Sequence, residues 1–118
     1  MKRLFLIVIM LFLCGCTSSN ENPKKDNSLT KIQQIIDSGD YIVLDVRTKE
    51  EYDVSHVVGA INIPLNEINE EIALDKTKKI LVYCQSGGRS TSAASLLESM
   101  GYTVYNMGGI GEVPLPVE

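Results

Sequence analysis

The sequence predicts an α/β domain built on a mainly parallel sheet. Apolar residues recur at helical spacing in some segments of residues 28–105 and form short β-branched runs in others. Residues 79–83 are the most strand-like segment, nearly continuous and apolar, as a buried central parallel strand should be. A chain of 118 residues has room for one domain of this kind. Strands that alternate with helices over this length are typical of the α/β class.

Each element is expected from its apolar spacing and its end signals. Thr48 and Glu51 have the spacing of a capping box, so a short helix should begin there. Gly39 and Gly101 stand where two of the helices should end. The expected strands are 41–46, 60–63, 79–83 and 103–105. Helices are expected over 28–38, 65–72 and 90–100, in addition to the short helix that starts at 48.

The first residues read as an export signal rather than as part of the fold. Lys2 and Arg3 form a positive start, and residues 4–13 are an unbroken apolar run of ten. That run is too short for a stable transmembrane helix, which needs about 20 residues. It has the length of the apolar region of a signal peptide, so residues 1–15 are expected to be one.

Leu13-Cys14-Gly15-Cys16 resembles a bacterial lipobox, which would place a lipid on Cys16 and make it the mature N-terminus. The protein is then expected outside the cytoplasm, anchored to the bacterial cell membrane as a lipoprotein. An ordinary cleaved secretory signal and an uncleaved anchor are the alternatives. Residues 16–27 lack large apolar side chains and are expected to be a flexible tether, followed by the domain at 28–118.

Charge and cysteine content narrow the function. The formal net charge is −4, and removal of Lys2 and Arg3 would make the chain more acidic, which argues against nucleic acid as a partner. With Cys14 removed and Cys16 acylated, Cys84 would be the only free thiol. An exported protein gains no disulfide from such a cysteine, so a reactive role is favoured. No His, Cys or Asp cluster has metal-ligand spacing, and neither a metal nor another cofactor is expected.

The stretch from Val82 to Ser90, VYCQSGGRS, carries the chemistry. Cys84 stands at the C-terminal end of the central strand, where open α/β sheets place their ligands. A glycine turn and a helix start follow, so backbone N–H groups and the helix N-terminus should face the sulfur and favour the thiolate. Arg89 adds a fixed positive charge suited to sulfur oxyanions. The plainer alternative is a small buried cysteine with no reactive role.

CQSGGRS resembles the active-site loop of rhodanese-like domains. LDVRTKEEYDVSHVVGAINIPL (44–65) is similar to the family's aspartate–valine–arginine segment and the stretch that follows it, and Met107-Gly108-Gly109-Ile110 is similar to its paired glycines. The resemblance covers about residues 28–110 and implies the rhodanese-like fold, with helices on both faces of the sheet. It assigns Cys84 as the nucleophile and, for substrate binding, Gln85, Ser86, Gly87, Gly88, Arg89, Ser90 and Arg47.

The resemblance also implies a sulfurtransferase that uses no cofactor. Cys84 would take sulfur from a small donor such as thiosulfate as a persulfide and pass it to a thiol or cyanide. Asp45 and Arg47 are expected to organise the loops beside the site, and His56 is expected to be structural. Glu51 and Tyr52 are expected to fix the short helix. Gln85 stands where thiosulfate-using members often carry arginine, so the identity of the donor stays open, as does any oligomeric state.

Two other function classes are compatible with parts of this pattern. Rhodanese-like domains that have lost the cysteine serve as binding modules, and the presence of Cys84 and Arg89 argues against that role here. Related phosphatases and arsenate reductases have one residue more between the cysteine and the arginine. This chain has four, Gln85 to Gly88, and the tighter loop suits a sulfur atom better than a phosphate.

Overall fold

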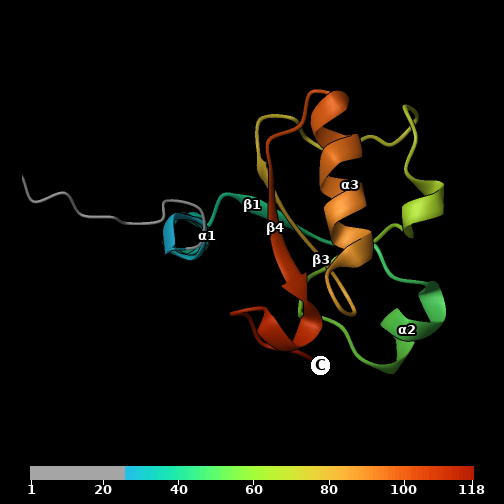
Figure 1. Cartoon of the computed structure of the whole chain (residues 1–118), viewed down its shortest axis with the longest axis horizontal. Coiled ribbons are helices and arrows are strands. Elements are labelled where there is room, and N and C mark those ends of the chain that lie inside the picture. Colours follow the sequence, from blue (N-terminus) through green and yellow to red (C-terminus); the bar gives the residue numbers. More distant parts are fainter. Residues whose placement is uncertain (1–25) are drawn as a thin grey trace, which may run out of the picture.

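The computed structural model describes residues 26–118 (Figure 1). The predicted signal peptide, the lipid site at Cys16 and nearly all of the predicted tether lie outside the described residues. The helices are α1 (Asp26–Ser38), α2 (Lys49–Val54) and α3 (Gly88–Ser99), and the strands are β1 (Tyr41–Asp45), β2 (Ile61–Asn62), β3 (Lys79–Cys84) and β4 (Val104–Gly109). None of the helices within 26–118 has the length and apolar character that a membrane span requires.

The four strands form one parallel sheet in the order β2-β1-β3-β4. The predicted α/β class with a parallel sheet is therefore confirmed. β3 is central and wholly apolar beyond Lys79, because both of its faces are covered. Asp45 at the end of β1 pairs with Tyr83, and Cys84 at the end of β3 pairs with Gly109. The carboxyl ends of three strands thus meet at one edge, which is where Cys84 lies.

Helices cover both faces of the sheet, as predicted (Figure 1). One core lies under α3 and joins Ala93 and Leu97 to Leu44, Val82 and Cys84 of the strands. The second core lies under α1, whose buried residues Ile32 and Ile35 pack with Val43, Leu81 and Tyr83. The alternation of β3 side chains between these two cores places Cys84 on the α3 side and Tyr83 on the α1 side.

The prediction of a helix over residues 65–72 is wrong. Only Leu65–Glu67 forms a helical turn, of the 3₁₀ type, and the chain then continues without regular structure. The side chain of Asn69 accepts a hydrogen bond from the backbone N–H of Glu71 at 2.8 Å, which gives the backbone an alternative to the helix. Ile68 and Ile72 still pack on the α3-side core, so their spacing reflects burial rather than a helix.

The other elements differ from expectation at their ends. α1 begins at Asp26 and α3 at Gly88, each two residues earlier than expected. β4 runs to Gly109, well beyond the expected end at Tyr105, with a register shift opposite Val82 and Tyr83. This longer strand carries the paired glycines to the edge of the sheet beside the Cys84 loop.

The segment after β4 returns to the domain and pairs with residues 56–58. Val57 and Val117 form an antiparallel bridge, and His56 and Glu118 exchange two backbone hydrogen bonds of 2.9 and 2.8 Å. Val57 is fully buried by this arrangement. The pairing therefore covers the part of the α1-side core to which Val57 belongs.

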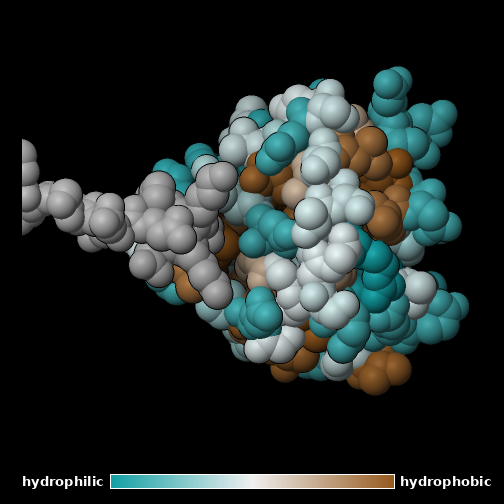
Figure 2. Space-filling model, viewed as in Figure 1, coloured by the Kyte–Doolittle hydropathy of each residue, from teal (hydrophilic) through white to brown (hydrophobic). Residues whose placement is uncertain are grey.

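Apolar surface gathers between α3 and the segment that follows β2 (Figure 2). A pocket of about 540 Å³ lies there, and its lining includes Ile72, Leu96, Met100 and Tyr102. Leu96, Met100 and Tyr102 belong to the C-terminal end of α3 and the residues after it, whereas Cys84 lies at the N-terminal end of that helix. This pocket is therefore remote from the predicted site.

Candidate active site

Cys84 is the last residue of β3, and a three-residue loop joins it to α3. Gly87, directly before that helix, has φ of +103°, a left-handed conformation that side chains disfavour. This turn bends the loop back so that its N–H groups point at the strand end. The side chains of Gln85 and Ser86 are exposed, while Ser90 in the first turn of α3 is buried.

The sulfur of Cys84 lies at the floor of this loop. The N–H of Gly87 donates to Sγ at 2.9 Å, and the hydroxyl of Ser90 lies 3.4 Å from it. Burial opposes ionisation of the thiol, but the hydrogen bonds from the Ser90 hydroxyl and from the N–H groups of Ser90, Gly87 and Ser86 outweigh it and lower the pKa of Cys84. The residue is 1% exposed, so small reagents have the best access to the sulfur.

We expect Ser90→Ala to raise the pKa of the Cys84 thiol. The substitution removes one of the hydrogen bonds that favour the thiolate and leaves the loop glycines unchanged. The measurement is the rate of alkylation by iodoacetamide as a function of pH, whose midpoint should lie below that of a free cysteine in the wild type and move upward in the variant. Ser92→Ala, an exposed position two residues along α3, is the matched control. Equal midpoints in all three proteins would remove Ser90 from the site.

Arg89 at the start of α3 forms a bidentate ion pair with Glu51 of α2. The two guanidinium-to-carboxylate distances are 2.6 and 2.9 Å, and both side chains are about one-third exposed. The Arg89 hydrogen bond is the largest cause that lowers the pKa of Glu51 to about 2, with a further contribution from Thr48. The pair is therefore fully charged at neutral pH. Arg89 also lies close enough to Cys84 and Asp45 for their negative charges to raise its pKa, after the larger effect of Glu51.

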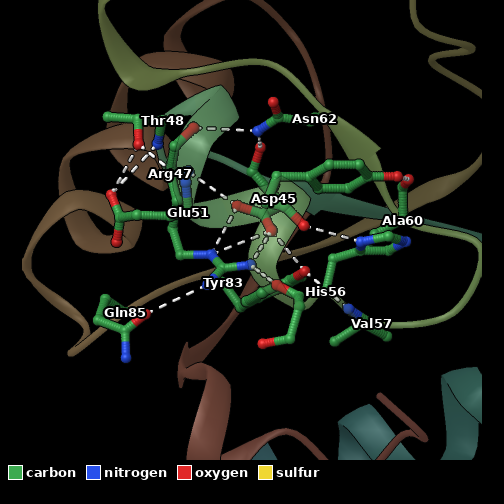
Figure 3. Close-up of polar contacts among 12 residues, drawn as sticks. Asp45, Arg47, Thr48, Glu51, His56, Val57, Ala60, Asn62, Tyr83 and Gln85 are labelled. Atoms are coloured by element: carbon green, nitrogen blue, oxygen red, sulfur yellow. Dashed lines mark hydrogen bonds and ion pairs between the residues drawn. The ribbon is translucent and has the colours of Figure 1, made fainter. Parts of the chain in front are cut away.

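Arg47 is buried beneath the loop, at 2% exposure, and each nitrogen of its guanidinium group makes a hydrogen bond (Figure 3). It forms an ion pair with Asp45 at 2.7 Å and donates to the carbonyl of Ser55 at 2.6 Å. It also donates to the side chain of Gln85 in the loop at 3.2 Å. Arg47, predicted to contact substrate, thus holds the first residue of the loop instead of facing the open side.

Tyr83 extends this buried network from Asp45 to the backbone of Val57. Its hydroxyl donates to Asp45 at 2.6 Å and accepts from the N–H of Val57 at 3.0 Å. Burial, followed by the hydrogen bond to Asp45, raises the pKa of the phenol. Nothing in the sequence pattern pointed to this role, because Tyr83 reads simply as one more apolar residue of the central strand.

We expect Tyr83→Phe to lower the free energy of unfolding by about 1–3 kcal/mol, since a buried N–H of Val57 loses its acceptor and Asp45 loses a donor. Urea unfolding measures the change. Tyr105→Phe, which removes a hydroxyl from β4, is the control and should be neutral. A Tyr83→Phe variant as stable as the wild type would show that this network contributes little.

Gly109 allows β4 to approach the loop closely. A side chain at this position would place its first carbon 2.6 Å from the carbonyl oxygen of Gln85 and 3.2 Å from Cα of Ser86. Gly108 adopts φ of +86° and its N–H bonds to the side chain of Asn106. The paired glycines therefore form one wall of the Cys84 loop.

His56 and Tyr52 have the structural contacts expected of them. The two rings stack with centroids 3.8 Å apart, and the N–H at Nδ1 of His56 donates to the carbonyl of Tyr52. The other ring nitrogen lies 3.1 Å from the carboxylate of Glu118, and the Tyr52 hydroxyl donates to Ala60. Within residues 26–118, no group of three or more His, Cys, Asp or Glu side chains could hold a metal ion.

A comparison with known protein families matches residues 28–112 to the Rhodanese-like domain. The chain belongs to the rhodanese-like family. The thiosulfate sulfurtransferase PspE of Escherichia coli is 47% identical over 77 residues, which cover 62% of this chain and 74% of that protein. The putative sulfur carrier protein YrkF of Bacillus subtilis is 34% identical over 88 residues, but the match spans only 48% of its length.

Solved rhodanese structures agree with the fold. A rhodanese with anions from E. coli superposes with a TM-score of 0.61 at 40% identity, over 66% of this chain and 96% of that one. A rhodanese-related protein from Thermoplasma volcanium gives a TM-score of 0.64 at 33% identity, over 75% of this chain and 92% of that one. The predicted rhodanese-like fold is confirmed, and the relatives support an activity of the sulfurtransferase type.

Proposed function

We propose that the protein is a sulfurtransferase that carries sulfane sulfur as a persulfide of Cys84, from a donor such as thiosulfate to a thiol or cyanide acceptor. The observation that supports this most is the N–H of Gly87 directed at Sγ of Cys84, 2.9 Å away, in a loop whose other amides also favour the thiolate. A thiolate is the nucleophile that the reaction needs.

In the first step the Cys84 thiolate attacks the outer sulfur of thiosulfate. A new S–S bond forms on Cys84, the S–S bond of thiosulfate breaks, and sulfite leaves with its electron pair. In the second step cyanide or a thiolate attacks the outer sulfur of the persulfide, and Cys84 leaves as the thiolate. The loop amides that face the sulfur would stabilise the negative charge in both steps.

The test uses the soluble domain, residues 26–118, after folding is verified by circular dichroism. Incubation with thiosulfate should add the mass of one sulfur atom at Cys84, and added cyanide should remove it and release thiocyanate. Failure to load sulfur from any sulfane donor would overturn the proposal. Release of phosphate from a general phosphatase substrate would instead favour the phosphatase alternative.

We further propose that the protein is a lipoprotein outside the cytoplasm, held to the cell membrane through Cys16. The short apolar run and the Leu-Cys-Gly-Cys sequence support this. Labelling of cells with palmitate should mark the full-length chain, and Cys16→Ser should abolish the label while Cys14→Ser keeps it. Labelling that survives Cys16→Ser would contradict the assignment of the lipid.

A further inference from the structure

The charged side chains around the loop cancel in pairs. Arg47 is paired with Asp45 at 2.7 Å, and Arg89 with Glu51 at 2.6 Å. The Cys84 thiolate then adds one uncompensated negative charge. Repulsion opposes the approach of a donor that carries two negative charges to this thiolate, because the carboxylate of Glu51 offsets the positive charge of Arg89.

An apolar groove lies directly beside Arg89. It has a volume of about 410 Å³ and is lined by Val46, Thr48, Pro64, Leu65, Asn66 and Arg89. Val46 belongs to the same buried core as Cys84, and Leu65 packs against that core. The groove therefore lies beside Arg89, at the residues that follow β1 and β2. Thiosulfate has no group that could fill it.

We propose that Glu51 and this groove make the site selective for singly charged organic sulfane donors, whose apolar arm lies in the groove. This inference rests on the proposed sulfur transfer and names its substrate class. Thiosulfonates and organic persulfides, R–S–S⁻, belong to this class. The Cys84 thiolate attacks the terminal sulfur, the bond between that sulfur and the R group's sulfur breaks, and the sulfinate or thiolate leaves with the electron pair.

Glu51 is a positioning residue in this scheme. Its carboxylate directs the guanidinium of Arg89 and also accepts from the N–H of Thr48 at 3.3 Å, which completes the cap of α2. Glutamine can keep that cap through its carbonyl oxygen. Glu51→Gln therefore removes the charge on Arg89's partner with little change to the helix.

The experiment measures the rate at which three donors load sulfur on Cys84, read by intact mass. Thiosulfate has two charges and no arm, methanethiosulfonate one charge and a minimal arm, and benzenethiosulfonate one charge and an apolar arm. The wild type should prefer benzenethiosulfonate. Glu51→Gln should raise the rate with thiosulfate relative to benzenethiosulfonate by about threefold, as expected for a partly exposed charge. Glu50→Gln, which removes the same charge from the exposed neighbouring position, should leave the ratio unchanged.

The groove is tested separately with Leu65→Asn. This variant should lower the rate with benzenethiosulfonate relative to methanethiosulfonate by about fivefold, since a polar side chain replaces an apolar contact. Leu96→Asn, in the remote pocket at the far end of α3, is the control. Donor ratios that do not change in Glu51→Gln, or an equal loss with both thiosulfonates in Leu65→Asn, would overturn this inference and leave the sulfur transfer intact. If no donor loads Cys84, the proposed function itself fails.

Discussion

Cys84→Ser should abolish sulfur transfer, with a loss of about a thousandfold or more in the rate of thiocyanate formation from thiosulfate and cyanide. A hydroxyl at this position would still accept the hydrogen bond from Gly87, so the loop keeps its shape. It would not ionise at neutral pH and cannot form a persulfide. Intact mass after exposure to thiosulfate measures the loading directly.

The fold of the Cys84→Ser variant is the control for this result. Its melting temperature should stay within a few degrees of the wild type, because the buried volume changes little. A variant that is folded and still releases thiocyanate at the wild-type rate would show that another group carries the sulfur. A variant that unfolds leaves the Ser90→Ala titration as the independent test of the thiolate.

Gly109→Ala should damage both the loop and the stability of the domain. The added methyl would meet the carbonyl oxygen of Gln85 at 2.6 Å and Cα of Ser86 at 3.2 Å, and both are backbone atoms that cannot rotate away. We expect the free energy of unfolding to fall by about 1–3 kcal/mol. The displaced loop should transfer sulfur more slowly by about tenfold or more, since its N–H groups no longer face Cys84.

Gly111→Ala is the matched control, two residues along the chain. A methyl at that position meets no atom within 4 Å, so stability and activity should stay close to those of the wild type. Urea unfolding and the thiocyanate assay measure both variants. If Gly109→Ala behaved like Gly111→Ala, the close approach of β4 to the loop would not be needed for the site.

The central elements were predictable from the sequence because local signals agree there. The apolar run that ends at Cys84 is long enough for a buried strand, and the glycine turn and Arg89 follow it directly. The expected helix over 65–72 failed because spacing alone does not distinguish a helix from an irregular segment that buries the same residues. The extension of β4 was missed because Asn106, Gly108 and Gly109 are poor strand formers, and pairing with β3 overrides that preference.

The polar contacts of the site were less predictable than its backbone. Arg89 and Glu51, like Tyr83 and Asp45, lie 38 residues apart in the chain and meet only through the tertiary fold. The sequence predicted that Glu51 would fix α2, and the capping box agrees with this role. The sequence did not reveal the ion pair of Glu51 with Arg89. Arg47 shows the same difficulty, because no local pattern tells whether an arginine points outward or into a buried network.

The strand order has a consequence for the newly made chain. β3 pairs with β1 on one side and β4 on the other, so the cysteine-bearing strand finds its neighbours on both sides of it in the sequence. Such non-local pairing forms slowly, because the chain between the strands must be closed into a loop first. Until the loop after β3 takes its folded shape, the N–H groups of Ser86, Gly87 and Ser90 do not face the sulfur, and the unfolded polypeptide carries an ordinary, mostly protonated and less reactive thiol. Reactivity is thereby switched on by folding itself.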